Sequence, residues 1–253
     1  MPWRALFVAL GLLLAGSAAS AQPAYLSLII DDLGNDPERD RHVLELPGPV
    51  AMAILPDAPY ATSLARQAHR AGRTILVHMP MAPADGPYAW LPHQPPFVWL
   101  ERLEGALRQV PHASGLNNHM GSRMTTDEAA MNLLMPELQR RHMFFVDSRT
   151  TAATVAAAQA QRINLASLSR DLFLDHDSHP EAVAAAFQRG VEIARRQGSV
   201  VMIGHPHAST LAVLQRELPK LAEQGIEWID LPMMIAVRGN QAMPAHGHNG
   251  VYR

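Results

Sequence analysis

Cysteine is absent from the 253-residue sequence, and this absence excludes several kinds of chemistry. Thiolate zinc sites, cysteine nucleophiles and disulfide bonds all need cysteine, so a metal would have to be held by histidine, aspartate or glutamate. An excess of one charge sign is also absent, since Lys+Arg 21 against Asp+Glu 23 gives a formal net charge of −2. Because binding to a phosphate backbone requires a basic field, nucleic acid is not expected as a partner.

Two kinds of segment are missing as well. The sequence contains neither GxGxxG nor GxxxxGK[ST], the glycine-rich loops that cradle phosphates, which argues against nucleotide-dependent functions. No segment reaches the ~18–20 consecutive apolar residues that span a bilayer. The sequence does contain 13 histidines, and its length is sufficient to bury one substantial core.

The first 21 residues have the features of a secretory signal peptide. Arg4 precedes an apolar run from Ala5 to Ala15, and Ala19-Ser20-Ala21 supplies small residues at the spacing that signal peptidase recognises. An uncleaved membrane anchor is the alternative, but the run is shorter than a membrane-spanning segment. We therefore expect cleavage after Ala21 and an exported chain with no membrane span, located in the periplasm if the source is a Gram-negative bacterium.

Short strand-like runs alternate with longer amphipathic stretches, a pattern typical of a parallel sheet covered by helices. The predicted strands are Tyr25–Ile30, Val50–Leu55, Thr74–Val77, Gly115–Asn118, Met143–Val146, Val200–Ile203 and Glu227–Ile229. The predicted helices are Ala61–Ala71, Val98–Gln109, Thr126–Arg141 with Thr126 as its N-cap, Pro180–Gln197 and Leu211–Gln224. The pattern predicts an α/β domain over residues 22–238, a proline-rich loop at Ala82–Pro96 and a flexible tail over residues 239–253.

Polar side chains follow five of the predicted strands. They are Asp31 and Asp32, His78, Asn118 and His119, Asp147 and Arg149, and His205 and His207. Because the carboxyl ends of parallel strands meet at one edge of a sheet, we expect these side chains to gather there. Asp32, His78 and His119 offer the carboxylate and imidazole ligands that Zn²⁺ takes, with a fourth position open for water. The alternative for each residue is structural, as a turn or N-cap aspartate or a hydrogen-bonded core histidine.

The segments Ile29–Gly34, Leu76–Met81, Asn117–Ser122, Asp147–Thr150 and Ile203–His207 read IIDDLG, LVHMPM, NNHMGS, DSRT and IGHPH. In this order they resemble the motifs of the divergent polysaccharide deacetylases, the YibQ-like branch of the NodB-homology carbohydrate esterases. The resemblance covers roughly Tyr25 to Val237. It implies a NodB-like distorted (β/α) barrel of about seven or eight mostly parallel strands, with the site at their C-terminal ends.

The resemblance also implies roles for individual residues. Asp31 matches the general base, Asp32 a metal ligand, and His78 the first of two metal-binding histidines. The second histidine of the parent family, four residues further on, is replaced here by Ala82. His119 would then supply the third ligand from the neighbouring strand. His205 matches the general acid that protonates the leaving amine, with His207 as a second candidate.

Other residues are assigned to the surroundings of this site. Asp147 and Arg149 match a motif that orients the catalytic pair, although an ordinary ion pair in a loop is the alternative. Asn118 and His207 are expected to support the site, and Asp175 to lie at its rim. Three aromatic residues, Tyr88, Trp90 and Trp99, are expected either to stack against a sugar ring or to serve as packing residues.

The implied activity is that of an exported metal-dependent hydrolase that removes acetyl groups from a carbohydrate or cell-envelope glycan. The implied cofactor is Zn²⁺ or another divalent transition metal. Because Ala82 removes one parental ligand, a non-catalytic periplasmic module that binds glycan or peptidoglycan in the old cleft is an alternative. A third hypothesis keeps the zinc and changes the bond, giving an O-deacetylase or an amidase with a different substrate.

Overall fold

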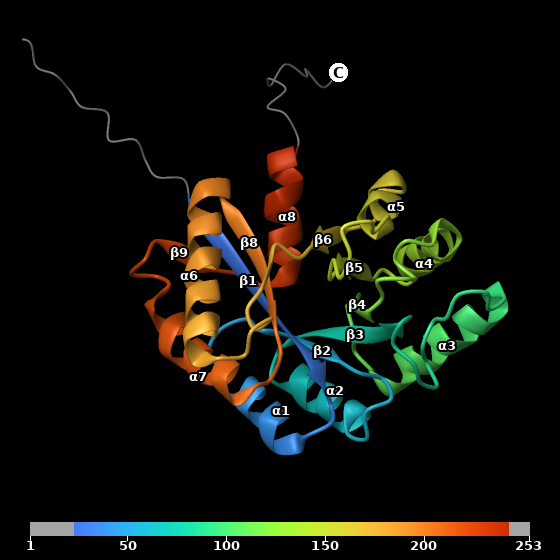
Figure 1. Ribbon diagram of the computed structural model, residues 1–253, viewed down its shortest axis with the longest axis horizontal. Coiled ribbons are helices and arrows are strands. Elements are labelled where there is room, and N and C mark those ends of the chain that lie inside the picture. Colours follow the sequence, from blue (N-terminus) through green and yellow to red (C-terminus); the bar gives the residue numbers. More distant parts are fainter. Residues whose placement is uncertain (1–22, 243–253) are drawn as a thin grey trace, which may run out of the picture.

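Nine strands form one curved sheet in the computed structural model, which describes residues 23–242 (Figure 1). They are β1 (Ala24–Leu33), β2 (Ala51–Ile54), β3 (Thr74–Met81), β4 (Gly115–Met120), β5 (Phe144–Asp147), β6 (Ser167–Ser169), β7 (Leu172–Phe173), β8 (Ser199–Gly204) and β9 (Ile226–Trp228). The strand order is β6-β5-β4-β3-β2-β1-β8-β7, and β9 pairs separately with β1. Every pairing is parallel, so the carboxyl ends of the strands lie along one edge.

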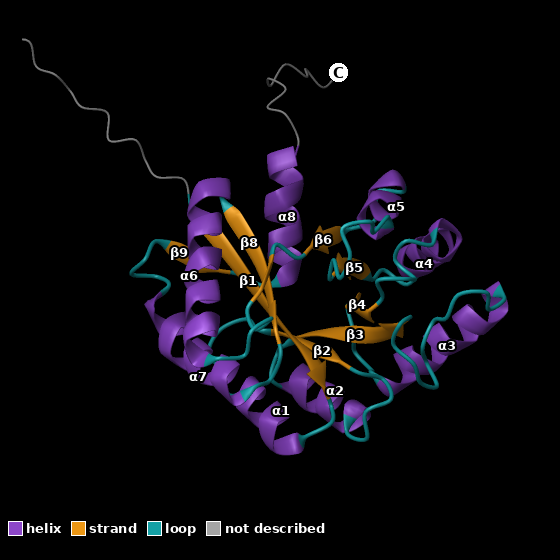
Figure 2. Ribbon diagram, in the orientation of Figure 1, coloured by secondary structure: helices purple, strands orange, loops and turns teal. Residues whose placement is uncertain are grey.

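Helices follow the outer, convex side of this sheet, and one further helix lies inside the curve (Figure 2). The outer helices are α1 (Pro37–Leu44), α2 (Ala61–Arg70), α3 (Pro96–Gln109), α4 (Glu128–Arg140), α5 (Ala156–Arg162), α6 (Pro180–Gln197) and α7 (Ala208–Glu217). The inner helix is α8 (Leu231–Ala242). The predicted α/β class with a parallel, barrel-like sheet is thus confirmed.

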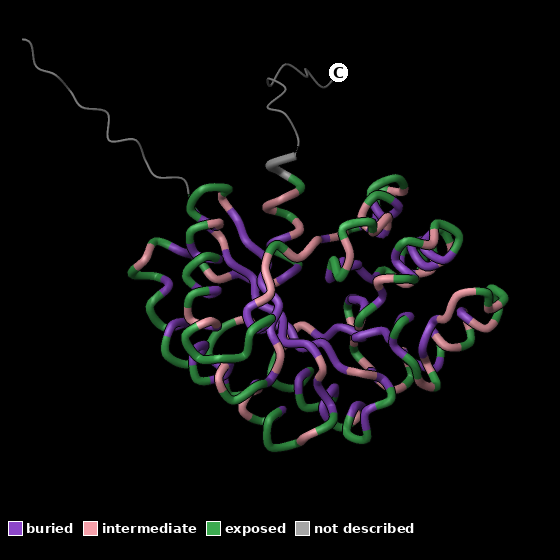
Figure 3. The backbone as a smooth tube through the Cα atoms, viewed as in Figure 1, coloured by how far each residue is buried: buried purple, intermediate pink, exposed green. Residues whose placement is uncertain are grey.

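Two hydrophobic clusters occupy the two faces of the sheet, and the strands between them are buried (Figure 3). The larger cluster packs the convex face against the outer helices, and the smaller packs the concave face against Leu231 and Met234 of α8. Side chains two positions apart on a strand point to the same face. The inward-facing side chains therefore change from apolar to polar toward the carboxyl ends of the strands. The apolar ones are Ile29, Leu76, Val146 and Ile203, and the polar ones two positions later are Asp31, His78, Ser148 and His205.

The predicted elements differ from the observed ones mainly where segments are short. The strands β6 and β7, of three and two residues, were not predicted, nor were α1, α5 and α8. The predicted helix Leu211–Gln224 is wrong at its end, because α7 stops at Glu217 and a 3-10 turn containing Pro219 follows. The N-cap of α4 is Asp127 rather than Thr126, since the Asp127 carboxylate accepts a hydrogen bond from the amide of Ala130.

The chain ends were predicted as a leader and a tail. Residues 1–21 lie outside the described residues, so the signal peptide stays a prediction. Helix α8 continues to Ala242, which places residues 239–242 of the expected tail in a helix, and the remainder lies outside the described residues. Within residues 23–242, no helix combines the length and the hydropathy that a bilayer crossing requires.

Candidate active site

An irregularity in β1 brings its two aspartates to the same site. The register pairs on either side of it are Ile30–Met52 and Leu33–Ile54. Between these pairs β1 has one residue more than β2, which makes a β-bulge, and Asp32 adopts a left-handed conformation with φ 59°. Aspartate tolerates this region better than most residues. In an unbroken strand Asp31 and Asp32 would point to opposite faces, whereas here both approach His78.

Three ligand atoms converge at the ends of β1, β3 and β4. The Asp32 Oδ1 atom lies 3.1 Å from His78 Nε2 and 2.9 Å from His119 Nδ1, and the two ring nitrogens are 3.1 Å apart. Ligand atoms held tetrahedrally at ~2.0–2.1 Å from a zinc ion are separated by about 3.3 Å, close to these spacings. The predicted set of Asp32, His78 and His119 is therefore brought together.

The hydrogen bonds around His78 show which of its ring nitrogens is available. His78 Nδ1 is 2.9 Å from Asn117 Oδ1, an atom that only accepts, so Nδ1 carries the proton and donates it. In neutral His78 the lone pair of Nε2 then points at Asp32 Oδ1, a buried oxygen with no hydrogen-bond partner among residues 23–242. This repulsion is relieved by a proton or by a metal ion. Because Asp31 and Asp32 outweigh burial and raise the pKa of His78, protons and metal compete for the same atoms.

Asn117 belongs to the candidate site by its contacts, although no separate role was expected for it. Its side chain is fully buried and bridges two site residues, accepting from His78 Nδ1 and donating from Nδ2 to Asp31 Oδ1 at 2.9 Å. Cross-strand pairing places it there, since Asn117 is in register with His78. A hydrogen bond of this kind fixes the tautomer and the orientation of a metal-binding histidine.

We expect Asn117→Ala to weaken zinc binding by about 10–100-fold, as removal of outer-shell partners typically does. His78 would lose its Nδ1 acceptor, and Asp31 would lose the amide that holds it. Competition titration of zinc against a fluorescent chelator measures the change. Asn164→Ala, on the loop before β6, is the matched control. An unchanged zinc affinity in Asn117→Ala would contradict this role.

The two aspartates differ in electrostatic environment. Burial raises the pKa of Asp31, and the neighbouring imidazoles and the Asn117 amide only partly offset this effect. Burial acts in the same direction on Asp32, but the imidazoles of His119 and His78 outweigh it, so the pKa of Asp32 is well below its ordinary value. Asp32 is thus suited to remain an anionic ligand, and Asp31 is suited to take up a proton.

His205 follows β8 and faces the same cluster. Its Nδ1 lies 2.9 Å from Asp175 Oδ1, and its backbone amide donates to Asp175 Oδ2 at 2.6 Å. Thr210 also donates to Asp175 Oδ2, at 2.8 Å. His205 Nε2 is left facing Asp32 Oδ2 at 3.9 Å. Burial alone would lower the pKa of His205, but Asp175, Asp31 and Asp32 raise it to about 9.

Asp175 was expected at the rim, and the structure gives it a more specific place. Its side chain is buried, and the hydrogen bonds from His205 and Thr210 outweigh burial, so that its pKa is lowered. An ionised Asp175 holds the imidazole by one nitrogen and keeps it protonated. No sequence spacing reveals this pair, because Asp175 and His205 follow β7 and β8, which become neighbours only in the folded sheet.

The other supporting residues act mainly on the backbone. Asp147 accepts from the amide of Arg149 at 2.8 Å and from the Thr154 hydroxyl at 2.9 Å, so the loop after β5 is held without an Asp147–Arg149 ion pair. Asn118 Oδ1 accepts from the amide of Ser148 at 2.9 Å. His207 is exposed at the start of α7, and its ring centre lies 5.9 Å from that of His205.

Trp90 is a packing residue, which is the second of the two roles expected for it. Its side chain is fully buried and stacks on Trp99, with ring centres 5.5 Å apart. Tyr88 is half-buried and packs over Gly105 of α3, where an added Cβ would lie 2.7 Å from the ring. These aromatics hold the loop after β3 against α3, and the loop therefore offers no aromatic face from Trp90 to a ligand.

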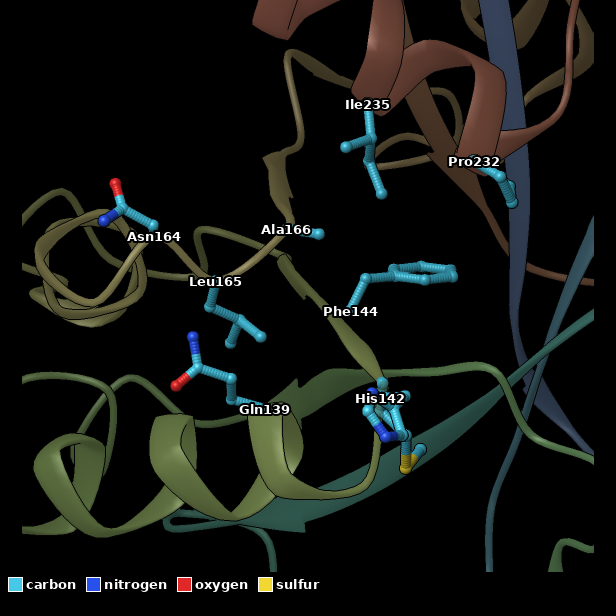
Figure 4. Close-up of a pocket in the computed structure, with 9 residues that line it drawn as sticks. Gln139, His142, Phe144, Asn164, Leu165, Ala166, Pro232 and Ile235 are labelled. Atoms are coloured by element: carbon cyan, nitrogen blue, oxygen red, sulfur yellow. The ribbon is translucent and has the colours of Figure 1, made fainter.

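Ala82 contributes to the core rather than to the ligand cluster. Ala82 is buried in the convex core, and its backbone pairs with Trp90 and Arg123, so the third candidate ligand beside Asp32 and His78 is His119. A hollow of about 390 Å³ lies elsewhere, between the amino ends of β5 and β6 and helix α8 (Figure 4). None of the residues that line it belongs to the candidate site.

A curled parallel sheet with a carboxylate–imidazole cluster at its carboxyl edge defines the class of NodB-like α/β barrel proteins. Residues 28–235 match the family model described as "Divergent polysaccharide deacetylase". The chain belongs to this family. The uncharacterized protein YibQ of Escherichia coli K12 is 37% identical over 195 residues, which are 76% of this chain and 61% of that protein. The chain therefore spans less than two thirds of this relative's length.

Solved structures share the fold. An uncharacterized protein from Agrobacterium tumefaciens C58 has a TM-score of 0.80 at 20% sequence identity, covering 85% of this chain and 91% of that one. A family 4 acetyl xylan esterase from Clostridium thermocellum, solved in complex with a cobalt ion, has a TM-score of 0.55 at 14% identity, covering 85% and 92% of the two chains. The predicted NodB-like fold and family are confirmed.

Proposed function

We propose that this protein is a zinc-dependent hydrolase that removes acetyl groups from N-acetylated sugars of a carbohydrate or cell-envelope glycan. The observation that carries the proposal is the convergence of Asp32, His78 and His119, with Asp31 and His205 beside them. Because the family model describes polysaccharide deacetylases, and because a protein that shares the fold is an acetyl xylan esterase solved with a cobalt ion, deacetylation is the activity that we infer. We further propose that the protein is exported before it acts.

A zinc ion held by Asp32, His78 and His119 would supply Lewis acidity and a bound water of lowered pKa. Asp31 is placed to accept a proton from such a water, since its carboxylate lies 3.6 Å from the ligand atom of His78 and its pKa is raised by burial. Asn117 holds the same carboxylate through Oδ1, which leaves Oδ2 directed at the metal-binding atoms. The general base is thus fixed in position.

His205 is placed to protonate the departing nitrogen. Asp175 engages Nδ1, so Nε2 is the nitrogen that faces the site, and with a pKa of about 9 the imidazole is protonated at neutral pH. Base and acid therefore approach the ligand cluster from β1 and β8, which are neighbouring strands. Water attack and proton donation to the leaving group need this separation of roles.

A non-catalytic glycan-binding module is the rival function, and Ala82 is the feature that favours it. The geometry weighs against this rival, because His119 occupies a ligand position and because a binding module has no need for a buried acid and an oriented histidine beside it.

The test is to supply the zinc-loaded chain with N-acetylated oligosaccharides, peptidoglycan and O-acetylated xylan, and to measure released acetate and free amine. Release of acetate with an equal amount of amine supports N-deacetylation. Acetate without amine would move the assignment to O-deacetylation. Binding of glycan without any acetate release, by a chain that retains zinc, would overturn the hydrolase proposal in favour of the binding module.

A further inference from the structure

A second polar hollow lies where the two edges of the sheet approach each other. It has a volume of about 380 Å³ and is lined by Arg149, Thr151, Ala152, Arg170, Asp171, Ile193 and Gln197. We call it the arginine hollow. Arg170 and Asp171 form the short link between the edge strands β6 and β7, and Arg149 follows β5.

The arginine hollow carries positive charge without a matching carboxylate. Within residues 23–242, neither the Arg149 nor the Arg170 guanidinium forms an ion pair. The nearby acids are engaged elsewhere, since Asp171 pairs with Arg238 and accepts from the amide of Val201. Burial lowers the pKa of Arg170 and the like charge of Arg149 adds to the effect, and together they outweigh the carboxylates of Asp147, Asp171 and Asp31, none of which forms an ion pair with Arg170. Two arginines left in this arrangement are stabilised by an anion.

The geometry of Arg170 leaves donors free for such an anion. Its Nε donates to the Ser148 carbonyl at 2.7 Å and one hydrogen of Nη2 donates to the Arg149 carbonyl at 2.8 Å. The guanidinium also lies over the Phe173 ring, 3.8 Å from its centre. These contacts hold the planar group rigidly, while the Nη1 hydrogens make no hydrogen bond to any residue from 23 to 242. A fixed guanidinium fork matches the two oxygens of a carboxylate or a phosphate.

The arginine hollow is linked to the candidate active site through shared residues. The Phe173 ring, which lies beneath Arg170, is 6.0 Å from the His205 ring between their centres. Ser148, whose carbonyl accepts from Arg170, also contacts Asn117 through its hydroxyl, at 3.3 Å. An anion held by Arg149 and Arg170 would thus lie beside the groups that position the general base and the general acid.

We propose that the arginine hollow binds a carboxylate or phosphate group, and that the substrate is an acidic glycan that bears this group near the acetylated sugar. The substrate class rests on the proposed function, whereas the anion site does not. The alternative is that the two arginines only hold the surrounding loops in place, in which case the protein would not prefer an anionic ligand to a neutral one. Substitution of Arg149 distinguishes the two explanations. Its side chain forms no hydrogen bond to residues 23–242, so it holds no loop in place.

The binding test uses calorimetric titration of the full chain with glucuronate, with inorganic phosphate and with neutral glucose. We expect both anions to bind and glucose not to, and Arg149→Gln to weaken anion binding by about tenfold or more, as loss of a charged hydrogen bond does. Arg189→Gln, on the exposed side of α6, removes the same charge without touching the hollow and is the control. Equal loss in both variants, or no anion binding, would overturn the proposal. Preference for glucuronate or for phosphate identifies which anion the site takes.

The substrate test compares acetate release from an acidic and a neutral N-acetylated oligosaccharide. We expect Arg149→Gln to raise KM for the acidic substrate about tenfold or more relative to KM for the neutral substrate, so that the preference for the acidic substrate is lost. Equal hydrolysis of the two substrates by the parent chain would overturn the acidic-glycan assignment while the hydrolase function stands. Anion binding that depends on Arg149 in a chain that hydrolyses neither substrate would instead remove the hydrolase function and leave the anion site.

Discussion

Zinc binding at one ion per chain is expected to disappear in His78→Ala and in His119→Ala. Each substitution removes one of three ligand atoms that lie about 3 Å from one another, and two ligands do not hold zinc at the affinity of three. The loss should exceed the 10–100-fold effect typical of outer-shell changes. Mass-spectrometric metal analysis after zinc loading and removal of excess metal measures it. Acetate release should vanish together with the zinc.

The control for these two variants is His69→Ala. His69 lies exposed on α2, stacks on His112 and is not one of the candidate ligands. The His69→Ala variant should therefore keep its zinc. Circular dichroism on all three variants separates loss of metal from loss of fold. If the parent chain takes up no zinc, the hydrolase mechanism fails, and the glycan-binding module becomes the function to pursue. If His119→Ala alone keeps its zinc, the ligand set is wrong at that position.

The strand-end residues were predictable because a parallel sheet places them at one edge regardless of their distance in sequence. Asp31, His78 and His205 each come two residues after an inward-facing apolar residue, and the pattern alone locates them. The bulge that turns Asp32 toward the same site was not predictable, since one inserted residue has no signature beyond the adjacent aspartates.

The hydrogen-bonding roles of the residues around them could not be assigned from the sequence, although Asp175 was expected at the rim of the site. Asn117 and Asp175 act through hydrogen bonds across neighbouring strands, and cross-strand register is a property of the folded sheet. A sugar-stacking role and a packing role were both expected for Trp90, and stacking on Trp99 buries it in the core. Large aromatics in long loops serve packing as readily as binding, and the sequence does not separate the two.

The short elements were missed because they carry too few residues to show a period. Strand β7 has two residues, and α1 has eight residues of which Asp40 and Val43 are buried, so neither gives a clear hydrophobic pattern. They matter to the site nevertheless. Strand β7 ends next to Asp175, and the carboxylate of Asp40 accepts from the amide of Gly34, in the turn that follows Asp32.

Asp31→Asn and His205→Asn are expected to lower kcat by about 10²–10⁴-fold while zinc stays bound, the effect typical of a lost general base or acid. Asp31→Asn keeps the size of the side chain, His205→Asn replaces the imidazole by a smaller polar group, and neither residue is one of the three candidate ligands. Zinc content and acetate release on the same samples separate chemistry from metal binding. His207→Asn is the matched control, because His207 is exposed and was the second candidate for the acid. A larger loss in His207→Asn than in His205→Asn would reverse the two assignments.

The pH dependence of kcat tests the same acid in the parent chain. His205 has a pKa raised to about 9, so it is protonated below that pH, and the rate should fall as pH rises through this value. Asp175 is a main cause of the raised pKa, and Asp175→Asn should therefore move the alkaline limb to lower pH. A purely structural role for Asp175 would lower the rate equally at every pH. An alkaline limb that stays in place in Asp175→Asn would thus show that another group donates the proton.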